Sequence, residues 1–484
     1  MSTPFEFRLN GQTVQVDDAS PNTPLLDYLR ARGLTGTKQG CAEGDCGACT
    51  VAMVDRDVSG QKTLRAFNSC IALLPMVAGR ELVTVEGVGS RAAPHPVQQA
   101  MVKHYGSQCG FCTPGFVVSM VEAYCRKDAG SPEAIADQLC GNICRCTGYR
   151  PIRDAMVDAL ATRDAKGAGP GLPCVSLEGP PSPTAPLRYE ARDGLFLRPT
   201  TWEDLLALRA LHPEAMLVAG ATELGVDITK KSRRYPFLIS TEGVEALRAI
   251  RREEDGWYVG GAASLVDVED ALGHEVPELA KMLNVFASRQ IRHRATLAGN
   301  LVTASPIGDT APVLLALDAR LVLASVRGER TVALSDFFLA YRKTALQPDE
   351  VVRFVVIPHA PAKDSGLTRH SDSFKVSKRR ELDISIVAAG FCIETDALGL
   401  VRTARLGYGG VAATPARAKQ TEAQLVGHPW NAEAVARVRA TLEREFTPLT
   451  DLRGSAEYRR GLVVSLLEKF ASGARSPALD GRPR

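Results

Sequence analysis

The sequence predicts a multidomain α+β protein, and three features support that prediction. The chain has 484 residues, 45% of them hydrophobic and 23% charged, which is enough for about three or four globular domains. Most of its twelve cysteines fall in residues 41–146. A stretch rich in proline and glycine, predicted as a linker over 166–190, separates that part from a longer region with alternating strand and helix patterns.

Residues 1–90 predict a small mixed α/β domain. Alternating apolar residues at 5–9 and 14–16 flank Asn10-Gly11, which is the pattern of a β-hairpin with a tight turn. Leu25, Leu26 and Leu29 mark a short amphipathic helix, and a strand is expected at 50–54.

The first cysteine group has the spacing C-x4-C-x2-C, followed after twenty residues by one more cysteine. This is the plant-type spacing for a 2Fe–2S cluster, and glycines lie between the ligands, where they allow close backbone approach. A set of buried thiols or a disulfide knot is the alternative, which the combined spacings disfavour. We therefore predict four cluster ligands, Cys41, Cys46, Cys49 and Cys70.

From His95 the hydrophobic period becomes helical, with Val97, Met101 and Val102 expected on one face, and an all-helical domain is predicted at 91–165. This domain holds a second group of thiolates, spaced C-x2-C and C-x-C and expected from two helix ends. The predicted ligands of a second 2Fe–2S cluster are Cys109, Cys112, Cys144 and Cys146.

Four further cysteines are left outside the two ligand sets. Cys140 competes as a ligand because it lies four residues before Cys144, and Cys125 is also available. Both are interpreted as structural, since a free cysteine is usually a small buried hydrophobe. No role is assigned to Cys174 or Cys392.

The run CGFCTPG at 109–115, with CRCTGY at 144–149, resembles the helical 2Fe–2S domain of the molybdenum hydroxylases. That family includes xanthine dehydrogenase, aldehyde oxidase and carbon monoxide dehydrogenase. The resemblance implies that all eight cysteines are ligands. It also implies that the helical cluster lies next to a molybdopterin, with Gln108 at the position that contacts it.

A third region combines a short apolar strand at 217–219 with the glycine turn 220–225. Backbone N–H groups in such a turn can bind phosphate oxygens, although an ordinary glycine turn looks the same. The spaced glycines of a dinucleotide-binding Rossmann fold are absent. A second loop, 295–306 followed by Asp309, adds hydroxyl groups and one carboxylate. Together the two loops favour a ribose and pyrophosphate site.

These loops resemble the FAD domain of the same family, which has the vanillyl-alcohol-oxidase type of flavin fold, and we place that domain at 191–368. The resemblance implies a C-terminal α+β flavoprotein domain at 369–475, in which the charged loop 378–381 reads as solvated or as lying near the flavin. It also implies a set of FAD-binding residues: Leu217, Val218, Ala219, Gly220, Ala221, Thr222, Glu223, Leu224, Phe286, Thr296, Asp309, Val352 and Lys375.

The resemblance as a whole implies the small subunit of a bacterial xanthine dehydrogenase. Electrons would pass from molybdopterin on a separate large subunit, through two 2Fe–2S clusters, to FAD and then to NAD. No catalytic residue is expected in this chain, and the expected assembly is a heterotetramer of two small and two large subunits. The alternatives are the same subunit of an aldehyde or N-heterocycle dehydrogenase, and a partner protein with vestigial sites.

Composition and charge limit the remaining function classes. The net charge of +3 is too small to indicate nucleic acid or a membrane surface. The sequence begins without a basic and apolar leader, and grouped cysteines in such a chain indicate metal binding rather than disulfides. A cytoplasmic location is therefore expected.

Overall fold

The computed structural model describes residues 4–126, 128–166, 185–362 and 364–473, which form two compact units. The first comprises Met1–Arg248, Ala262–Asp270 and Ala287–Thr296, and the second comprises Ala249–Gly261, Ala271–Phe286 and Leu297–Arg484. Helices and strands are mixed in both units, so the predicted multidomain α+β class is confirmed. In the described part of the chain no helix is both long and apolar enough to cross a membrane.

The first unit begins with a five-stranded sheet of order β2-β1-β5-β3-β4. The predicted hairpin is present: β1 and β2 pair from Phe5↔Val16 to Leu9↔Gln12. Asn10 and Gly11 between them have φ values of 51° and 81°, as a type I′ turn requires. The elements of this part are β1 (Phe5–Leu9), β2 (Gln12–Val16), α1 (Leu25–Ala31), β3 (Thr50–Arg56), β4 (Lys62–Asn68), β5 (Glu81–Val83) and α2 (Val85–Val88).

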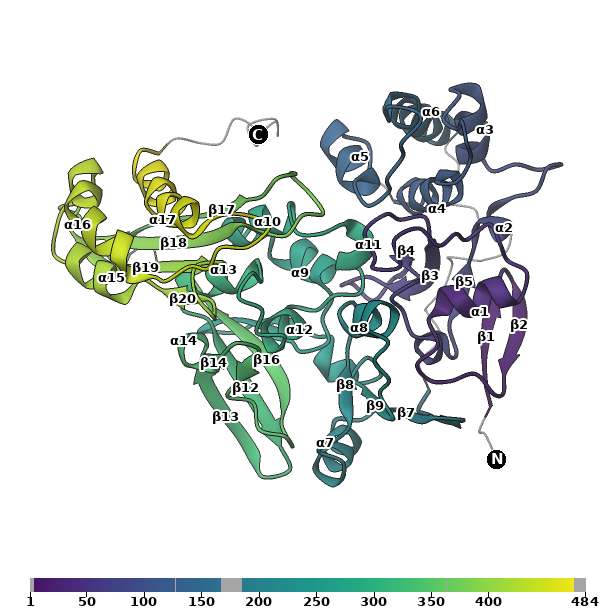
Figure 1. Ribbon diagram of the computed structural model, residues 1–484, viewed down its shortest axis with the longest axis horizontal. Helices are drawn as coiled ribbons and strands as arrows, with labels where there is room; N and C mark the ends of the chain where they lie inside the picture. The colour runs from purple at the N-terminus through teal and green to yellow at the C-terminus, as the bar shows by residue number, and fades with distance from the viewer. Residues whose placement is uncertain (1–3, 127, 167–184, 363, 474–484) are drawn as a thin grey trace. The chain divides into compact units, whose positions relative to one another are not determined.

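Four helices follow and form a compact group in Figure 1. They are α3 (Pro96–Lys103), α4 (Thr113–Tyr124), α5 (Pro132–Leu139) and α6 (Arg150–Lys166). Helix α4 packs against β3, β4 and its neighbouring helices, which explains why it is apolar on nearly all sides. The prediction for Val102 was wrong: Val97 and Met101 are buried four residues apart, whereas Val102 is 77% exposed.

A second sheet of the first unit has the order β6-β7-β9-β8. Strand β6 overlaps the end of the range predicted as the linker, because its short alternating pattern directly follows the segment rich in proline and glycine. Its side chains share a core with the first sheet. The elements are β6 (Leu187–Ala191), β7 (Gly194–Arg198), α7 (Trp202–Leu211), β8 (Met216–Val218), α8 (Leu224–Lys231), β9 (Phe237–Ser240) and α11 (Arg289–Arg292).

The second unit is built on two larger sheets, ordered β10-β11-β16-β12-β13 and β17-β18-β19-β20. Helix α13 packs on β18 and β19, where Gly390 and Gly407 leave room for the backbone of Pro312. Helices α15 to α17 gather beside the second of these sheets (Figure 1).

The strands of the second unit are β10 (Ile250–Arg252), β11 (Gly256–Gly260), β12 (Arg320–Ser325), β13 (Gly328–Ala333), β14 (Phe338–Ala340), β15 (Lys343–Thr344), β16 (Val351–Pro358), β17 (Thr368–Val376), β18 (Val387–Thr395), β19 (Val401–Gly409) and β20 (Ala416–Arg417). Its helices are α10 (Pro277–Leu283), α12 (Leu297–Val302), α13 (Thr310–Ala316), α14 (Leu334–Phe337), α15 (Lys419–Leu425), α16 (Ala432–Glu445) and α17 (Ala456–Ala471). Helix α9 (Leu265–Leu272) begins in the first unit.

Candidate iron–sulfur and flavin sites

The loop 40–49 places sulfur atoms among backbone N–H groups. The Sγ of Cys41 accepts hydrogen bonds from the backbone nitrogens of Glu43, Asp45 and Cys46 at 3.3–3.4 Å. The Sγ of Cys46 accepts from the backbone nitrogen of Cys41 at 3.3 Å. Such N–H···S contacts stabilise thiolate ligands and tune the clusters that they hold.

The other two cysteines of this group are buried beneath the loop. Cys49 and Cys70 share a small apolar cluster. The Cys70 thiol donates a hydrogen bond to Cys49. This bond is the main reason why the pKa of Cys49 lies below its usual range. The pKa of Cys41 is far below its usual range because the thiols of Cys46 and then Cys70 donate to it. These thiol contacts link the four cysteines in the order Cys46, Cys41, Cys70 and Cys49.

A 2Fe–2S cluster has two irons that need two thiolates each, so it would use all four of these sulfurs. Among the described residues no three His, Cys, Asp or Glu side chains are grouped as for a single metal ion. The eleven cysteines that the structure describes all carry free thiols. Four neighbouring free thiols fit the donor set of a 2Fe–2S cluster, and the ligand assignment stays a prediction.

Two glycines of the loop are required by its geometry. A Cβ on Gly40 would lie 2.6 Å from the Sγ of Cys46. Gly47 has a φ of +67°, and a Cβ there would lie 2.2 Å from the carbonyl oxygen of Gly141. The loop thus encloses the sulfurs only because side chains are missing at these positions.

The second cysteine group reaches from the helical core to the surface, since Cys144 is buried while Cys109 and Cys146 are exposed. Cys112 is the N-cap residue of α4, and burial raises the pKa of its thiol to about 12. Its thiol contacts Cys144, and Cys109 contacts Cys146. Cys144 and Cys146 lie in the loop between α5 and α6 rather than at a helix end, which corrects that part of the prediction.

The cysteines outside the two sets have other environments. Cys140 follows the last residue of α5, and its Sγ donates to the carbonyl oxygen of Asp137 at 3.1 Å. Cys125 follows α4, and burial raises the pKa of its thiol to about 12. Cys392 lies buried in β18, and Cys174 is outside the described residues. The interpretation of Cys125 and Cys140 as structural residues stays a prediction.

The two cysteine loops are joined directly. The backbone nitrogen of Ile143 donates to the carbonyl oxygen of Cys46 at 3.0 Å. The side-chain amide of Asn142 donates to the carbonyl oxygen of Gly47 at 3.1 Å. Because Cys46 and Cys144 belong to different predicted clusters, the clusters are held at neighbouring backbone positions.

One buried polar segment, residues 288–294, was missed as a structural element by sequence reasoning. It carries three arginines, one histidine and one glutamine, all less than 9% exposed, which is rare for such residues unless they are paired. Each has a partner elsewhere in the first unit. The pairs are Arg289–Glu122, Gln290–Asn142, Arg292–Asp137, His293–Ala66 and Arg294–Glu242.

The sequence signal for this segment was its four basic side chains in six positions, Arg289 to Arg294. A charge run is usually solvated, so burial could not be read from composition. The acidic partners come from distant positions, including α4, α5 and the turn after β9.

The predicted FAD residues of the first unit lie on two adjoining loops. Leu217 and Val218 end strand β8, and Ala221 has a φ of +60°. A Cβ on Gly220 would lie only 1.7 Å from the carbonyl oxygen of Arg294. Gly220 therefore lets the glycine turn pass directly against the turn after α11 that leads to Thr296. The predicted second loop is not continuous, because residues 297–302 form helix α12.

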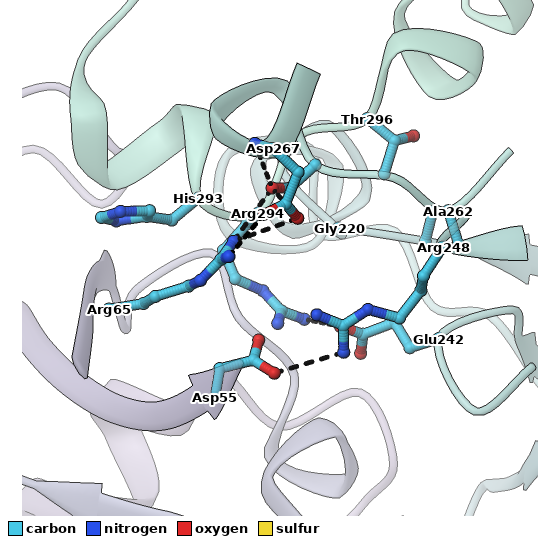
Figure 2. Close-up of a pocket in the computed structure, with 12 residues that line it drawn as sticks. Asp55, Arg65, Gly220, Glu242, Arg248, Ala262, Asp267, His293, Arg294 and Thr296 are labelled. Carbon is cyan, nitrogen blue, oxygen red and sulfur yellow. Dashed lines mark hydrogen bonds and ion pairs between the residues drawn. The ribbon is translucent and has the colours of Figure 1, made fainter. Parts of the chain in front are cut away.

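Figure 2 shows a polar cavity of about 20 Å³ beside these loops. Its charged residues are paired: Arg65 contacts Asp267 at 2.5 and 3.3 Å, and Arg248 contacts Asp55 at 3.2 Å. Burial alone would raise the pKa of Asp55, but Arg248, Arg80 and Arg65 hold it far below its usual range. The volume suits one water molecule and excludes a flavin. The lining residues are Asp55, Arg65, Ala219, Gly220, Glu242, Arg248, Ala262, Ser264, Asp267, His293, Arg294 and Thr296.

Four predicted FAD residues lie in the second unit: Phe286, Asp309, Val352 and Lys375. The ammonium group of Lys375 donates to Asp309 Oδ2 and to the carbonyl oxygen of Val285, both at 2.9 Å. Asp309 also accepts from Ser385 at 2.5 Å. Lys375 and Asp309 thus form a buried ion pair beside Phe286, while Val352 is buried in β16.

The charged loop 378–381 is mainly exposed, as the simpler interpretation expected. Lys378 donates to the carbonyl oxygen of Leu452 at 3.2 Å, and Arg380 pairs with Glu381 at 3.1 Å. Among the described residues, these contacts keep the loop at the surface of the second unit.

Four family models match successive parts of the chain. They are a 2Fe–2S iron–sulfur cluster binding domain at 7–74, a [2Fe–2S] binding domain at 84–157, an FAD binding domain in molybdopterin dehydrogenase at 188–360 and a CO dehydrogenase flavoprotein C-terminal domain at 372–474. The matched ranges contain every predicted cluster ligand and every predicted FAD residue.

Curated relatives resemble the chain over nearly its whole length. A xanthine dehydrogenase of Emericella nidulans is 34% identical and aligns with 96% of this chain and 38% of its own length. A xanthine dehydrogenase/oxidase of Gallus gallus is also 34% identical, with 96% and 39% covered. The chain therefore spans less than two fifths of the length of these relatives.

Solved structures show the same arrangement for part of the chain. A reconstituted CO dehydrogenase from Oligotropha carboxidovorans matches with a TM-score of 0.52 and 26% identity, covering 56% of this chain and 94% of that one. A CO dehydrogenase from Hydrogenophaga pseudoflava that lacks the Mo-pyranopterin moiety matches with a TM-score of 0.53 and 25% identity, covering 59% and 96%.

Proposed function

We propose that this chain serves a xanthine dehydrogenase. The premise is that it belongs to the molybdenum hydroxylase family and carries the iron–sulfur and FAD electron-transfer domains of that family. In this proposal a partner bearing molybdopterin oxidises hypoxanthine and xanthine to urate, and this chain delivers the electrons to NAD. The resemblance to curated xanthine dehydrogenases supports the purine substrate.

The eight cysteines of the two groups are proposed to hold the clusters, and the residues predicted for FAD are proposed to bind it. When bound, the clusters supply one-electron steps and FAD converts them to a two-electron step. The protein supplies N–H donors to Cys41 and Cys46 and a closely packed phosphate loop at Gly220. We also propose that the chain divides into domains at 1–90, 91–165, 191–368 and 369–475.

One observation carries the proposal that electrons enter at the second cluster. Cys109 and Cys146 are exposed, and three large apolar side chains near them, Phe111, Ile143 and Tyr149, are 39–48% exposed. Exposed apolar side chains around a redox site favour contact with another protein surface. This face suits a molybdopterin-bearing partner, with Gln108 at its edge.

The finer parts of the proposal concern the assembly. We propose a separate large subunit, a heterotetramer of two small and two large subunits, NAD as acceptor and a cytoplasmic location. Free thiols in both groups support a reducing compartment.

A second candidate is the corresponding part of another molybdenum hydroxylase. The CO dehydrogenase structures favour this second candidate. A little more than half of this chain aligns with almost the whole length of each of their matched chains. An aldehyde or N-heterocycle dehydrogenase is the same kind of alternative. The mechanism within this chain is the same in each case, and only the substrate differs.

The test uses the complex that purifies with this chain. Subunit masses and stoichiometry come first, then iron and flavin content, then bleaching of the visible spectrum by xanthine, an aldehyde, an N-heterocycle or carbon monoxide. We expect four irons and one FAD per copy, bleaching by xanthine, and turnover with NAD that exceeds turnover with oxygen alone, before and after a disulfide-forming reagent. Bleaching by another substrate only would favour the second candidate, and protein without iron or flavin would refute both.

A further inference from the structure

A buried group of uncharged side chains lies between the two cysteine loops. The Oδ1 of Asn142 accepts hydrogen bonds from the Oγ of Ser119 at 2.7 Å and from the Nε2 of Gln290 at 2.9 Å. The Nε2 of Gln290 also donates to the Oγ of Ser119 at 2.9 Å. With the bond from Asn142 to Gly47, this group joins the first loop, helix α4, the second loop and helix α11.

The backbone around this group allows almost no displacement. A Cβ on Gly115 would lie 2.1 Å from the carbonyl oxygen of Gly47, and one on Gly141 would lie 2.0 Å from the Oε1 of Gln290. Asn142 and Gln290 are themselves 2% and 1% exposed. Buried hydrogen bonds favour the arrangement that makes them, and here the Oε1 of Gln290 is the atom of its amide that has no hydrogen-bond partner among the described residues.

We propose that Asn142 and Gln290 are positioning residues that set the separation and orientation of the two predicted clusters, and thereby the rate of electron exchange between them. The inference rests on the proposed function, because it requires both clusters to be bound. In the exchange one cluster loses the electron that the other gains, and no covalent bond or proton changes place. The two amides are uncharged, so they fix the loops without favouring the electron on either side.

The first test replaces Gln290 with methionine in the intact complex. Gln290→Met keeps an unbranched side chain and removes the two N–H donors. Each reduced 2Fe–2S cluster carries one unpaired electron, so when both are reduced their magnetic interaction splits the EPR signals and weakens with distance. We expect smaller splitting and about tenfold slower electron exchange, as for other residues that orient metal ligands, with iron and FAD content unchanged.

The second test changes charge rather than shape. Asn142→Asp retains the acceptor for Ser119 and Gln290 and places a negative charge between the predicted clusters, which opposes electron uptake by both. In an EPR-monitored redox titration, the reduction potentials of both signals should fall. This variant also keeps the inference testable if Gln290→Met does not fold.

Asn22 provides the matched control. It is also a buried amide, and it joins distant segments by accepting from the backbone nitrogen of Tyr235 at 2.8 Å and donating to its carbonyl oxygen at 3.0 Å. Asn22→Leu and Asn22→Asp should lower stability while leaving the splitting and both potentials unchanged. Unaltered splitting in Gln290→Met, or unaltered potentials in Asn142→Asp, with both clusters present, would overturn the inference. Wild-type complex without two EPR signals would instead overturn the proposed function.

Discussion

The carboxylate of Glu122 is a buried charge with several partners near the C-terminal end of α4, and replacing it tests how the first unit is held together. Glu122 lies on α4 and is fully buried. It contacts Arg289 at 3.2 Å, Arg126 at 3.3 Å and His293 at 3.8 Å, and it accepts a hydrogen bond from Gln138. Glu122→Gln keeps the shape of the side chain and removes this charge.

The expected cost can be worked from the pKa. Burial alone would raise the pKa of Glu122, but Arg289, Arg126 and His293 outweigh it and lower the pKa from 4.5 to about 2. At about 1.36 kcal/mol for each pKa unit, this lowering of the pKa corresponds to about 3 kcal/mol of stability. Removing one partner of a buried ion pair typically costs about 3–5 kcal/mol. The two values agree, so we expect a loss of about 3 kcal/mol.

The pH dependence has a definite sign. Because the pKa in the folded protein lies below that of the unfolded chain, the contribution is fully present above about pH 4.5 and is lost as the pH falls toward about 2. Urea unfolding followed by circular dichroism should therefore show the same difference between wild type and Glu122→Gln from about pH 5 to pH 9.

A control variant and a double variant distinguish the loss of the buried Glu122 charge from the small effect of losing any ion pair. Glu443→Gln breaks an exposed pair with Arg439 on α16 and should cost less than about 1 kcal/mol. Adding Arg289→Met to Glu122→Gln should recover part of the loss, because no uncompensated arginine then remains. A loss in Glu122→Gln no larger than in Glu443→Gln would show that the pairing is not what stabilises this site.

Three further outcomes follow from the geometry. Gly220→Ala should abolish FAD retention or folding of the loop, because its Cβ would lie 1.7 Å from the carbonyl oxygen of Arg294; full flavin content by absorbance would contradict this. Cys144→Ser should remove one of two EPR signals and two irons, whereas Cys140→Ser should remove neither, and loss of a signal in the latter would reassign the ligand. Lys375→Met should lower FAD content with iron unchanged, because a buried aspartate loses its counter-charge; a fluorescence assay of released flavin measures this.

Local patterns were sufficient where one residue type determines the backbone. Asn10 and Gly11 specify the turn of the first hairpin, and the cysteine and glycine spacing specifies the first loop. Helix α4 followed from its apolar run. In these places the structure depends on neighbours in the sequence.

The prediction failed where distant parts of the chain decide the outcome. Val102 was assigned to a buried face because apolar residues cluster there, but its position one residue beyond Met101 turns it away from the core. The arginines of residues 288–294 could not be predicted as buried, since their partners, such as Glu122 and Asp137, lie more than 150 residues earlier in the chain. Likewise, the amide group around Asn142 depends on two helices and two loops meeting.

The unequal exposure of the two cysteine groups bears on how iron and sulfide can reach the protein. Cys49 and Cys70 are at most 2% exposed and pack against Ile291 of the segment 288–294, so that docked segment closes over them. Cys109 and Cys146 remain open to solvent. Within the proposed function we expect the first cluster to be assembled more readily before the later segment docks, while the two exposed cysteines of the second group stay within reach of a donor protein. The order of maturation would then depend on which cysteines the chain itself covers.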